Sequence, residues 1–509
     1  MRPTPSNYLP LSLLAAAVLS GCGGSSDTAS VAATPRVLQG AAVATPAAVS
    51  TPAAVNPLLP VANEAGEALT LSSAGSIDRS NPFFQGQGNG RSCASCHQPD
   101  NGWSIGPDKL AARFTASNGL DPVFRSVDGA VSPLAATTTL EQKRLAYALL
   151  LGKGLIRVGL PLPAGAEFSL ASVDDPYHYA SASELSLFRR PLPTTNLKFL
   201  SSVMWDGRET ATGTTGANCL RNVRPALCFA SIDSSLLHQS NAAVRGHAEA
   251  AADLSAAQQR AIVDFEQTLF TAQITSSSAG SLTAAGALGG PLALSQTAYY
   301  FGINDLEAGD YQSGAPFNRS VINLYGAWRN LDRPQPPAQR GRPPAAPTAT
   351  DLARAAIARG EQIFNNKGFN ITGVAGFNDE LRRPLARGSC TSCHDAPGIG
   401  SQSVARLFNT GVAAAALRSA DLPLYTLRNN ATGETVATSD PGAAMVSGKW
   451  KDIGRFKVPS LRGLESRSPY FHDGSAASIE ALVKFYDTRF AIGYTPQEAA
   501  DLAAFLKAL

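Results

Sequence analysis

Two short runs of residues have the spacing that attaches a c-type haem covalently. Cys93, Cys96 and His97 stand in the order C-x-x-C-H, and the same order returns at residues 390–394. Two thiols on a short turn can add to the two vinyl groups of one porphyrin, and the adjacent histidine then lies under the iron as its axial ligand. The sequence therefore predicts two covalent c-type haems, with these cofactor-binding residues: Cys93, Cys96, His97, Cys390, Cys393 and His394.

Other kinds of site share this cysteine spacing. A zinc site would need further Cys or His ligands at close spacing, and neither run has one nearby. A redox-active C-x-x-C pair or a chance match could also produce the spacing. The return of the whole five-residue pattern argues against chance, so haem attachment is the preferred interpretation.

The start of the chain has the features of an exported lipoprotein. Arg2 precedes the apolar run 9–19, which is too short to span a membrane and is typical of a signal peptide. The Leu-Ser-Gly-Cys run that ends at Cys22 resembles the lipobox of bacterial lipoproteins, so residues 1–21 are the predicted signal peptide and Cys22 the lipidated residue. An ordinary signal peptide, with Cys22 a bystander, is the alternative. The predicted location is the periplasm, with a lipid anchor to a bacterial membrane.

Composition divides the chain into segments. Residues 22–75 are rich in Ala, Thr, Val, Ser and Pro, which predicts a flexible tether. The remainder is long enough for two domains, one for each haem motif, and we place them at residues 76–335 and 350–509. The formal net charge of +3 gives no reason to expect a nucleic-acid partner.

Helical signals dominate both predicted domains. Ser255 with Gln258, and Thr495 with Glu498, have the capping-box pattern that begins a helix. A third helix is expected after Ser478, because apolar residues then follow on one helical face. Sustained alternation at period two is scarce. The predicted fold class is mainly α, with long loops between the helices.

Two cysteines are left after the haem motifs and the lipobox. Cys219 and Cys228 lie close together in a stretch that contains Gly, Asn and Pro. In an oxidising compartment such a pair is best explained as a structural disulfide, which would stabilise the fold by roughly 2 to 3 kcal/mol. A reactive thiol pair is the alternative.

Two further runs complete a resemblance to a known family. They are the Trp-Asp-Gly-Arg run that begins at Trp205 and the Ser-Pro-Tyr-Phe-His-Asp-Gly run of residues 468–474. With the haem motifs, they make residues 76–509 similar to the bacterial dihaem cytochrome c peroxidase and MauG superfamily. The resemblance implies two cytochrome c-like helical domains. His97 would serve the haem where peroxide reacts, His394 the haem that exchanges electrons, and Trp205 would lie between the two.

The resemblance also implies residues of a peroxide pocket. Gln239 and Glu249 keep the ten-residue spacing of a family glutamine and glutamate that line it, although an insertion precedes them. A carboxylate there could take a proton from one peroxide oxygen and return it to the other. In the alternative, Glu249 is a surface carboxylate and His247 or His238 is the base.

The sixth ligand of the second haem would distinguish two branches of the family. Tyr486 stands fourteen residues after His472, where family peroxidases have a methionine and MauG-like members a tyrosine. The resemblance therefore implies Tyr486 as an iron ligand and a lower reduction potential for this haem. In the alternative, Tyr486 packs on an apolar helix face and Met445 is the ligand.

Two features of many family members have no clear counterpart. A histidine that blocks the peroxide-side iron would lie between the first haem motif and Trp205, where the only histidine is His178, in an unrelated context. The peroxide-side iron is therefore expected to be open. Arg190 occupies the place of a family asparagine that binds calcium. Calcium is possible but weakly supported, since it would rely on carbonyls and water.

The implied function is reduction of hydrogen peroxide to water, with oxidising equivalents shared between two haems through Trp205. The implied partners are hydrogen peroxide and a small periplasmic electron donor. One alternative is a MauG-like oxidant that uses peroxide to modify residues on a partner protein. A second is an electron-transfer dihaem cytochrome.

Overall fold

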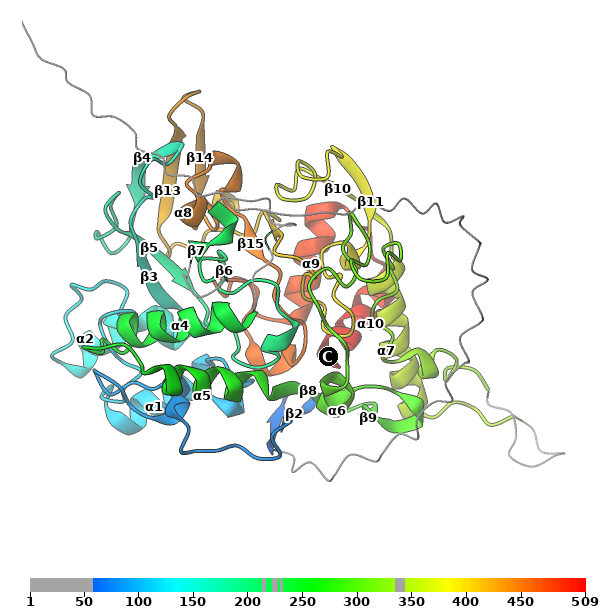
Figure 1. Ribbon diagram of the computed structural model, residues 1–509. Helices are drawn as coiled ribbons and strands as arrows, with labels where there is room; N and C mark the ends of the chain where they lie inside the picture. Colours follow the sequence, from blue (N-terminus) through cyan, green and yellow to red (C-terminus); the bar gives the residue numbers. More distant parts are fainter. Residues whose placement is uncertain (1–57, 213–216, 222–227, 229–231, 335–343) are drawn as a thin grey trace, which may run out of the picture. The chain divides into compact units, whose positions relative to one another are not determined.

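Two groups of helices and several small antiparallel sheets make up the described part of the chain (Figure 1). The computed structural model describes residues 58–212, 217–221, 228, 232–334 and 344–509, which belong to one compact unit. The predicted signal peptide and Cys22 lie outside these residues. The α-helices are α1 (Pro107–Ser117), α2 (Leu140–Ala146), α3 (Ala148–Lys153), α4 (Ile232–Gly246), α5 (Ala256–Gln267), α6 (Gly290–Ser295), α7 (Ala349–Asn366), α8 (Ala444–Ser447), α9 (Ile479–Phe490) and α10 (Pro496–Lys507).

The strands form several small sheets, and all of their pairings are antiparallel. The largest has the order β1 (Leu58–Asn63), β2 (Gly66–Ser72), β8 (Leu269–Ser276), β9 (Gly280–Ser281). A three-stranded sheet has the order β14 (Thr435–Thr438), β13 (Leu424–Asn429), β4 (Phe168–Asp174). The two-stranded sheets pair β3 (Ile156–Leu160) with β5 (Leu185–Arg189), β6 (Ala211–Thr212) with β7 (Ala217–Asn218), β10 (Phe369–Thr372) with β11 (Leu385–Gly388), and β12 (Leu407–Phe408) with β15 (Phe456–Lys457).

The prediction of a mainly α fold is wrong. Helices account for 32% of the chain and strands for 18%. The strands are short, so each alternating stretch is too brief to stand out in the sequence. In β4 the side chains of Phe168 and Leu170 do face the core at period two, but β5 is buried along its whole length and shows no alternation.

The predicted tether also ends earlier than expected. Residues 58–72 form β1 and β2, and β2 pairs along its length with β8. Residues 58–72 can serve as strands because neighbouring strands satisfy their backbone hydrogen bonds. Side chains add to this pairing. The buried hydroxyl of Thr70 bonds Thr271 on β8 at 2.8 Å and accepts a hydrogen bond from Trp103 Nε1.

In the described ranges, no helix has the length and apolar character needed to cross a bilayer.

The three helix starts predicted from capping residues are confirmed. Ser255 begins α5 and Thr495 begins α10, each with both hydrogen bonds of the capping box, and the Ser478 hydroxyl caps α9. α10 packs against α7 at very close range at Gly360, where a side-chain carbon would collide with the carbonyl oxygen of Asp501. α7, α9 and α10 thereby enclose one apolar core, and α4 with α5 lies beside another (Figure 1).

The sheet of β4, β13 and β14 joins segments that lie far apart in the sequence. β4 comes from the half of the chain that contains the first haem motif, and β13 from the half that contains the second. Tyr425 on β13 is buried, and its hydroxyl bonds both backbone groups of Ser186 on β5, 239 residues away. The two halves therefore share a core.

Candidate functional site

The two C-x-x-C-H motifs fold into the same turn. Each is a short 3-10 helix, η2 (Cys93–Ser95) and η10 (Cys390–Ser392). A serine before each helix donates its backbone N–H to the serine at its end, at 3.0 Å in the first motif and 3.1 Å in the second. The histidine N–H then bonds the carbonyl of the first cysteine, at 2.9 Å and 3.0 Å. This turn brings both thiols and the imidazole of a motif to one cavity wall.

The orientation and protonation of both imidazoles suit them to bind a metal ion. His97 Nδ1 donates to the carbonyl of Trp103 at 3.1 Å, and His394 Nδ1 donates to the carbonyl of Gly400 at 2.5 Å. Each bond leaves Nε2 as the free donor atom and fixes the ring. Burial lowers the pKa of both histidines to about 4, so both are neutral. The thiols of the motifs are unpaired, and burial raises the pKa of all four. The residues present fit a covalently attached haem at each motif.

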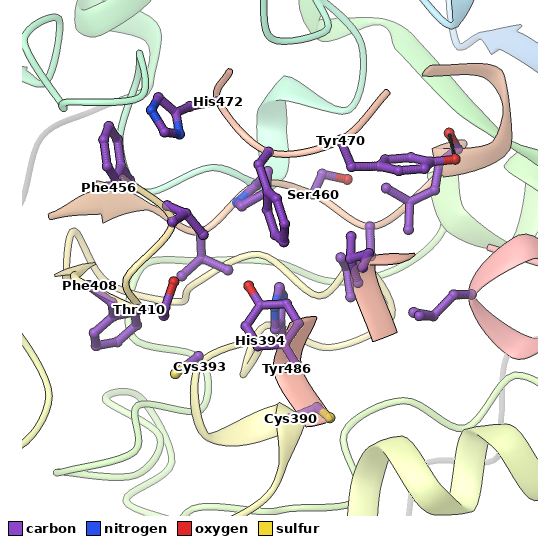
Figure 2. A pocket seen from close by; sticks show the side chains of 18 of the residues that line it. Cys390, Cys393, His394, Phe408, Thr410, Phe456, Ser460, Tyr470, His472 and Tyr486 are labelled. Atoms are coloured by element: carbon purple, nitrogen blue, oxygen red, sulfur yellow. Dashed lines mark hydrogen bonds between the residues drawn. The ribbon is translucent and has the colours of Figure 1, made fainter. Parts of the chain in front are cut away.

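We call the cavity beside the second motif the His394 cavity. Figure 2 shows His394 and Tyr486 pointing into it, with Cys390 and Cys393 on the neighbouring loop. Tyr486 comes from α9 and stacks on Phe490, with ring planes 5° apart. Met445 does not line this cavity. It is buried instead in the apolar cluster of the β4–β13 sheet, so of the two predicted ligands only Tyr486 faces the cavity.

The surroundings of Tyr486 favour its neutral form in the absence of a cation. Burial raises the pKa of the phenol, the Cys393 thiol adds to this, and Thr410 acts in the opposite direction. A ferric iron would supply the missing positive charge and favour the phenolate. His472 lies against Phe456 in the same cavity, with ring centroids 4.3 Å apart.

We call the cavity beside the first motif the His97 cavity. Gln239 on α4 and His247 after its end line the cavity together with His97. Glu249 does not line it: the side chain is exposed and accepts a hydrogen bond from Asn89 Nδ2 at 2.8 Å. The predicted spacing of Gln239 and Glu249 is present in the sequence, but the chain turns at Glu249, whose φ is +51°.

Two other histidines of this half of the chain, His238 and His178, do not line the His97 cavity. His238 neighbours Gln239 on α4 but faces outward and pairs with Glu209 at 2.6 Å. His178 is exposed in the loop after β4 and does not line the His97 cavity. Among the described residues, His247 is the histidine besides His97 that lines this cavity.

Trp205 lines both cavities. Its indole Nε1 donates to the carbonyl of Arg190 at 2.7 Å, and its own carbonyl accepts from the N–H of Lys457 at 2.8 Å. Its ring centroid lies 6.4 Å from that of His472. The indole therefore forms part of a common wall of the two cavities.

A buried ion network fixes the segment next to Trp205. Asp206 is fully buried and accepts from Arg189 Nη1 at 2.5 Å, and the same guanidinium donates to both carboxylate oxygens of Asp440 at 2.6 and 2.9 Å. Burial alone would raise the pKa of Asp206, but Arg189 and Arg208 lower it well below its usual range. The sequence alone does not predict this network, because Asp440 belongs to no recognisable motif.

Two buried cations also belong to the common wall. Arg190 donates to the backbone carbonyls of Lys153, Ile105 and Ser468, and burial lowers its pKa to about 10. Burial, with a smaller effect of Arg467, lowers the pKa of Lys457 to about 7. Within the described ranges no group of three or more His, Cys, Asp or Glu could hold a metal ion. Calcium stays a prediction.

The remaining cysteines are bonded to each other. The structure joins Cys219 and Cys228 in a disulfide, and both are buried. Leu220 beside Cys219 packs in one cluster with Leu407 on β12. Cys219, Leu220 and Cys228 thereby pack against the half of the chain that contains the second haem motif.

Comparisons with known proteins agree with the motifs. No family model matches the chain. It is 30% identical over 142 residues to the cytochrome-c peroxidase IdrP1 of Denitromonas iodatirespirans, covering 24% of this chain and 37% of that protein. It is 33% identical over 128 residues to the cytochrome c551 peroxidase of Nitrosomonas europaea, covering 25% and 32%. Each match spans well under half the length of the relative.

One solved structure aligns over most of the chain. It is the crystal structure of a MauG-like protein associated with microbial copper homeostasis, and the alignment covers 84% of this chain and 87% of that one. The TM-score is 0.32 and the identity 14%, which are too low to support a conclusion about fold or function. The chain is thus similar in part of its sequence to bacterial cytochrome c peroxidases, and this agrees with the resemblance of its paired motifs to the dihaem cytochrome c peroxidase and MauG superfamily.

Proposed function

We propose that the chain is an exported dihaem peroxidase that reduces hydrogen peroxide to water. The observation that carries this proposal is the common wall: each cavity has its own C-x-x-C-H motif, and Trp205 lines both. A c-type haem at His97 would supply the iron that binds peroxide and accepts its oxidising equivalents. The two electrons needed per peroxide would come from a small periplasmic electron-donor protein.

The residues have distinct roles in this proposal. His97 and His394 would each bind a haem iron through Nε2, and their Nδ1 bonds keep the imidazoles oriented. Trp205 provides an oxidisable ring between the cavities, fixed by its bond to Arg190. Gln239 offers an amide at the His97 cavity to orient the substrate by hydrogen bonding. Tyr486 provides the second axial donor in the His394 cavity.

Export and anchoring are part of the proposal. The segment that carries the predicted signal peptide and Cys22 lies outside the described residues, so these features rest on the sequence alone. The buried disulfide and the covalent haem motifs are both consistent with an oxidising compartment.

Haem counting combined with a peroxide assay tests the proposal. Intact mass should show two haems on the wild type and one on the double variant Cys93→Ala with Cys96→Ala. The double variant Cys390→Ala with Cys393→Ala is the matched control, and it should also hold one haem. Peroxide consumption with a reduced c-type cytochrome should depend on both motifs. A wild type that holds two haems but consumes no peroxide would refute the peroxidase activity.

A second candidate is favoured by Tyr486. Because Tyr486 rather than Met445 lines the His394 cavity, the chain fits a MauG-like oxidant that modifies a partner protein. A phenolate ligand stabilises oxidised iron, which suits the storage of oxidising equivalents more than the uptake of electrons from a donor. If peroxide is consumed only when a partner protein is present and becomes oxidised, this candidate replaces the first.

A further inference from the structure

A buried carboxylate holds His247 at the edge of the His97 cavity. Asp128 is 5% exposed, and its Oδ2 lies 2.5 Å from His247 Nδ1. Its Oδ1 accepts from Arg91 Nη1, also at 2.5 Å. Arg91, Asp128 and His247 all line the cavity. The carboxylate occupies Nδ1, so Nε2 is left as the atom that can exchange a proton.

The loop that carries His247 is anchored to the residues just before the haem motif. Asn89 bonds the carbonyls of Ala248 and His247, at 2.7 and 3.0 Å, and Arg91 also donates to the His247 carbonyl at 3.1 Å. Gly88 makes this approach possible, because a side-chain carbon there would collide with the Ala248 carbonyl. The histidine is therefore fixed with respect to the turn that positions Cys93 and His97.

The same contacts turn Glu249 away. Its backbone has a positive φ, and its carboxylate bonds Asn89 on the exposed side of the loop. Gln239 faces the cavity, but a neutral amide is not a base at physiological pH. His238 faces outward and pairs with Glu209. Glu266 also lines the cavity, but it is buried and its charge acts on the Cys93 thiol of the haem motif. Among Gln239, Glu249, His238 and His247, only His247 both lines the cavity and can carry a proton.

We propose that His247, oriented by Asp128, is the acid–base residue of peroxide cleavage in the His97 cavity. This inference rests on the proposed function and names the catalytic base of that site. His247 Nε2 takes the proton of the peroxide oxygen that binds the iron and returns it to the other oxygen. That oxygen leaves as water when the O–O bond breaks, and His247 ends in its starting protonation state. The oxygen left behind would become a second water by taking up two electrons and two protons, and the electrons would come first from the iron site and Trp205 and then from the donor protein.

Asp128 and Arg91 are positioning residues in this scheme. Asp128 selects the tautomer and stabilises the imidazolium, as carboxylates paired with histidine do elsewhere. Burial alone would raise the pKa of Asp128, but His247 and Arg91 lower it, so the carboxylate is ionised at neutral pH. Arg91 is 3% exposed and is also held by the carbonyls of Pro122 and Val123.

The test uses the holoenzyme with variant His247→Gln and two matched controls, His238→Gln and Glu249→Gln. Haem content and the resting absorption spectrum are measured first. Stopped-flow absorption then gives the rate constants for peroxide and for cyanide, whose conjugate acid must lose a proton to bind. We expect His247→Gln to slow both reactions by about 10² to 10⁴-fold with an unchanged haem content, and both controls to stay close to the wild type.

Asp128→Asn adds a readout that a structural role would not give. It should slow both reactions less than His247→Gln does, and the double variant should be no slower than His247→Gln alone, because Asp128 acts through the imidazole. Wild-type rates in His247→Gln, or a change in its resting spectrum that shows a lost iron ligand, would overturn the inference. A wild type that binds cyanide quickly yet does not react with peroxide would instead overturn the proposed function, while the cyanide rates would still test His247.

Discussion

Replacing Arg189 by methionine should destabilise the protein strongly and in a pH-dependent way. Arg189 makes three charged hydrogen bonds to Asp206 and Asp440, and all three side chains are at most 3% exposed. Arg208 would still lie 3.1 Å from Asp206, whereas Asp440 would keep the Gly442 N–H at 2.7 Å and His472 at 3.9 Å. Removing one partner of a buried ion pair costs about 3 to 5 kcal/mol, and we expect a loss of that size at pH 7.

The sign of the pH dependence follows from the buried carboxylate of Asp206. In the wild type the pKa of Asp206 is held low, so its contribution is present at neutral pH and is lost only in acid, as pH falls through that low pKa. Without Arg189, burial should raise the pKa of Asp206 above its value in the unfolded chain, which is about 3.9. The folded variant then binds protons that the unfolded chain does not, so its stability rises as pH falls. The gap to the wild type should narrow from about pH 7 to about pH 5.

Urea unfolding followed by circular dichroism at both pH values measures this gap from the midpoints and slopes. Lys109→Met is the control, since it removes an exposed pair with Asp100 and should cost about 0 to 1 kcal/mol. If Arg189→Met is no less stable than this control at pH 7, the network does not act as a buried ion network. A gap that widens towards pH 5 would contradict the protonation argument.

Three further predictions concern the cofactor cavities. Tyr486→Met should raise the reduction potential of the second haem, as seen by spectroelectrochemistry, and an unchanged potential and spectrum would show that the phenol is not a ligand. Trp205→Phe should preserve the initial reaction with peroxide but slow the sharing of oxidising equivalents between the haems, because phenylalanine is harder to oxidise than indole; stopped-flow spectra separate the two steps. The fully oxidised protein should react with peroxide without a lag, since His178 lies outside the His97 cavity; a lag that pre-reduction removes would reveal a blocking ligand.

The parts of the fold that could be predicted depend on short-range signals. Both haem motifs and the starts of α5, α9 and α10 are encoded within five residues, where backbone hydrogen bonds determine the outcome. The strands could not be predicted in this way, because a strand such as β5 has no alternation and is stabilised by partners elsewhere in the chain. No local sequence pattern predicts which strand will pair with β5.

The residues of the candidate site also differ in how well the sequence predicts them. Trp205 could be found from its motif, and the structure places it on both cavities. Spacing alone suggests Glu249, but a left-handed residue in the loop turns its side chain outward. His247 stands in the sequence only as a second possibility, and nothing there links it to Asp128, which lies 119 residues earlier.

The pairing of β4 with β13 affects how the protein can mature in the cell. β4 cannot complete its sheet until residues 424–429 have emerged, and Lys457 completes the wall that Trp205 shares. The half of the chain with the first motif therefore cannot finish folding before most of the second half is available. Folds that depend on such distant contacts form slowly. We expect this delay to lengthen the time during which Cys93 and Cys96, which line the His97 cavity in the finished fold, are accessible for attachment of their haem.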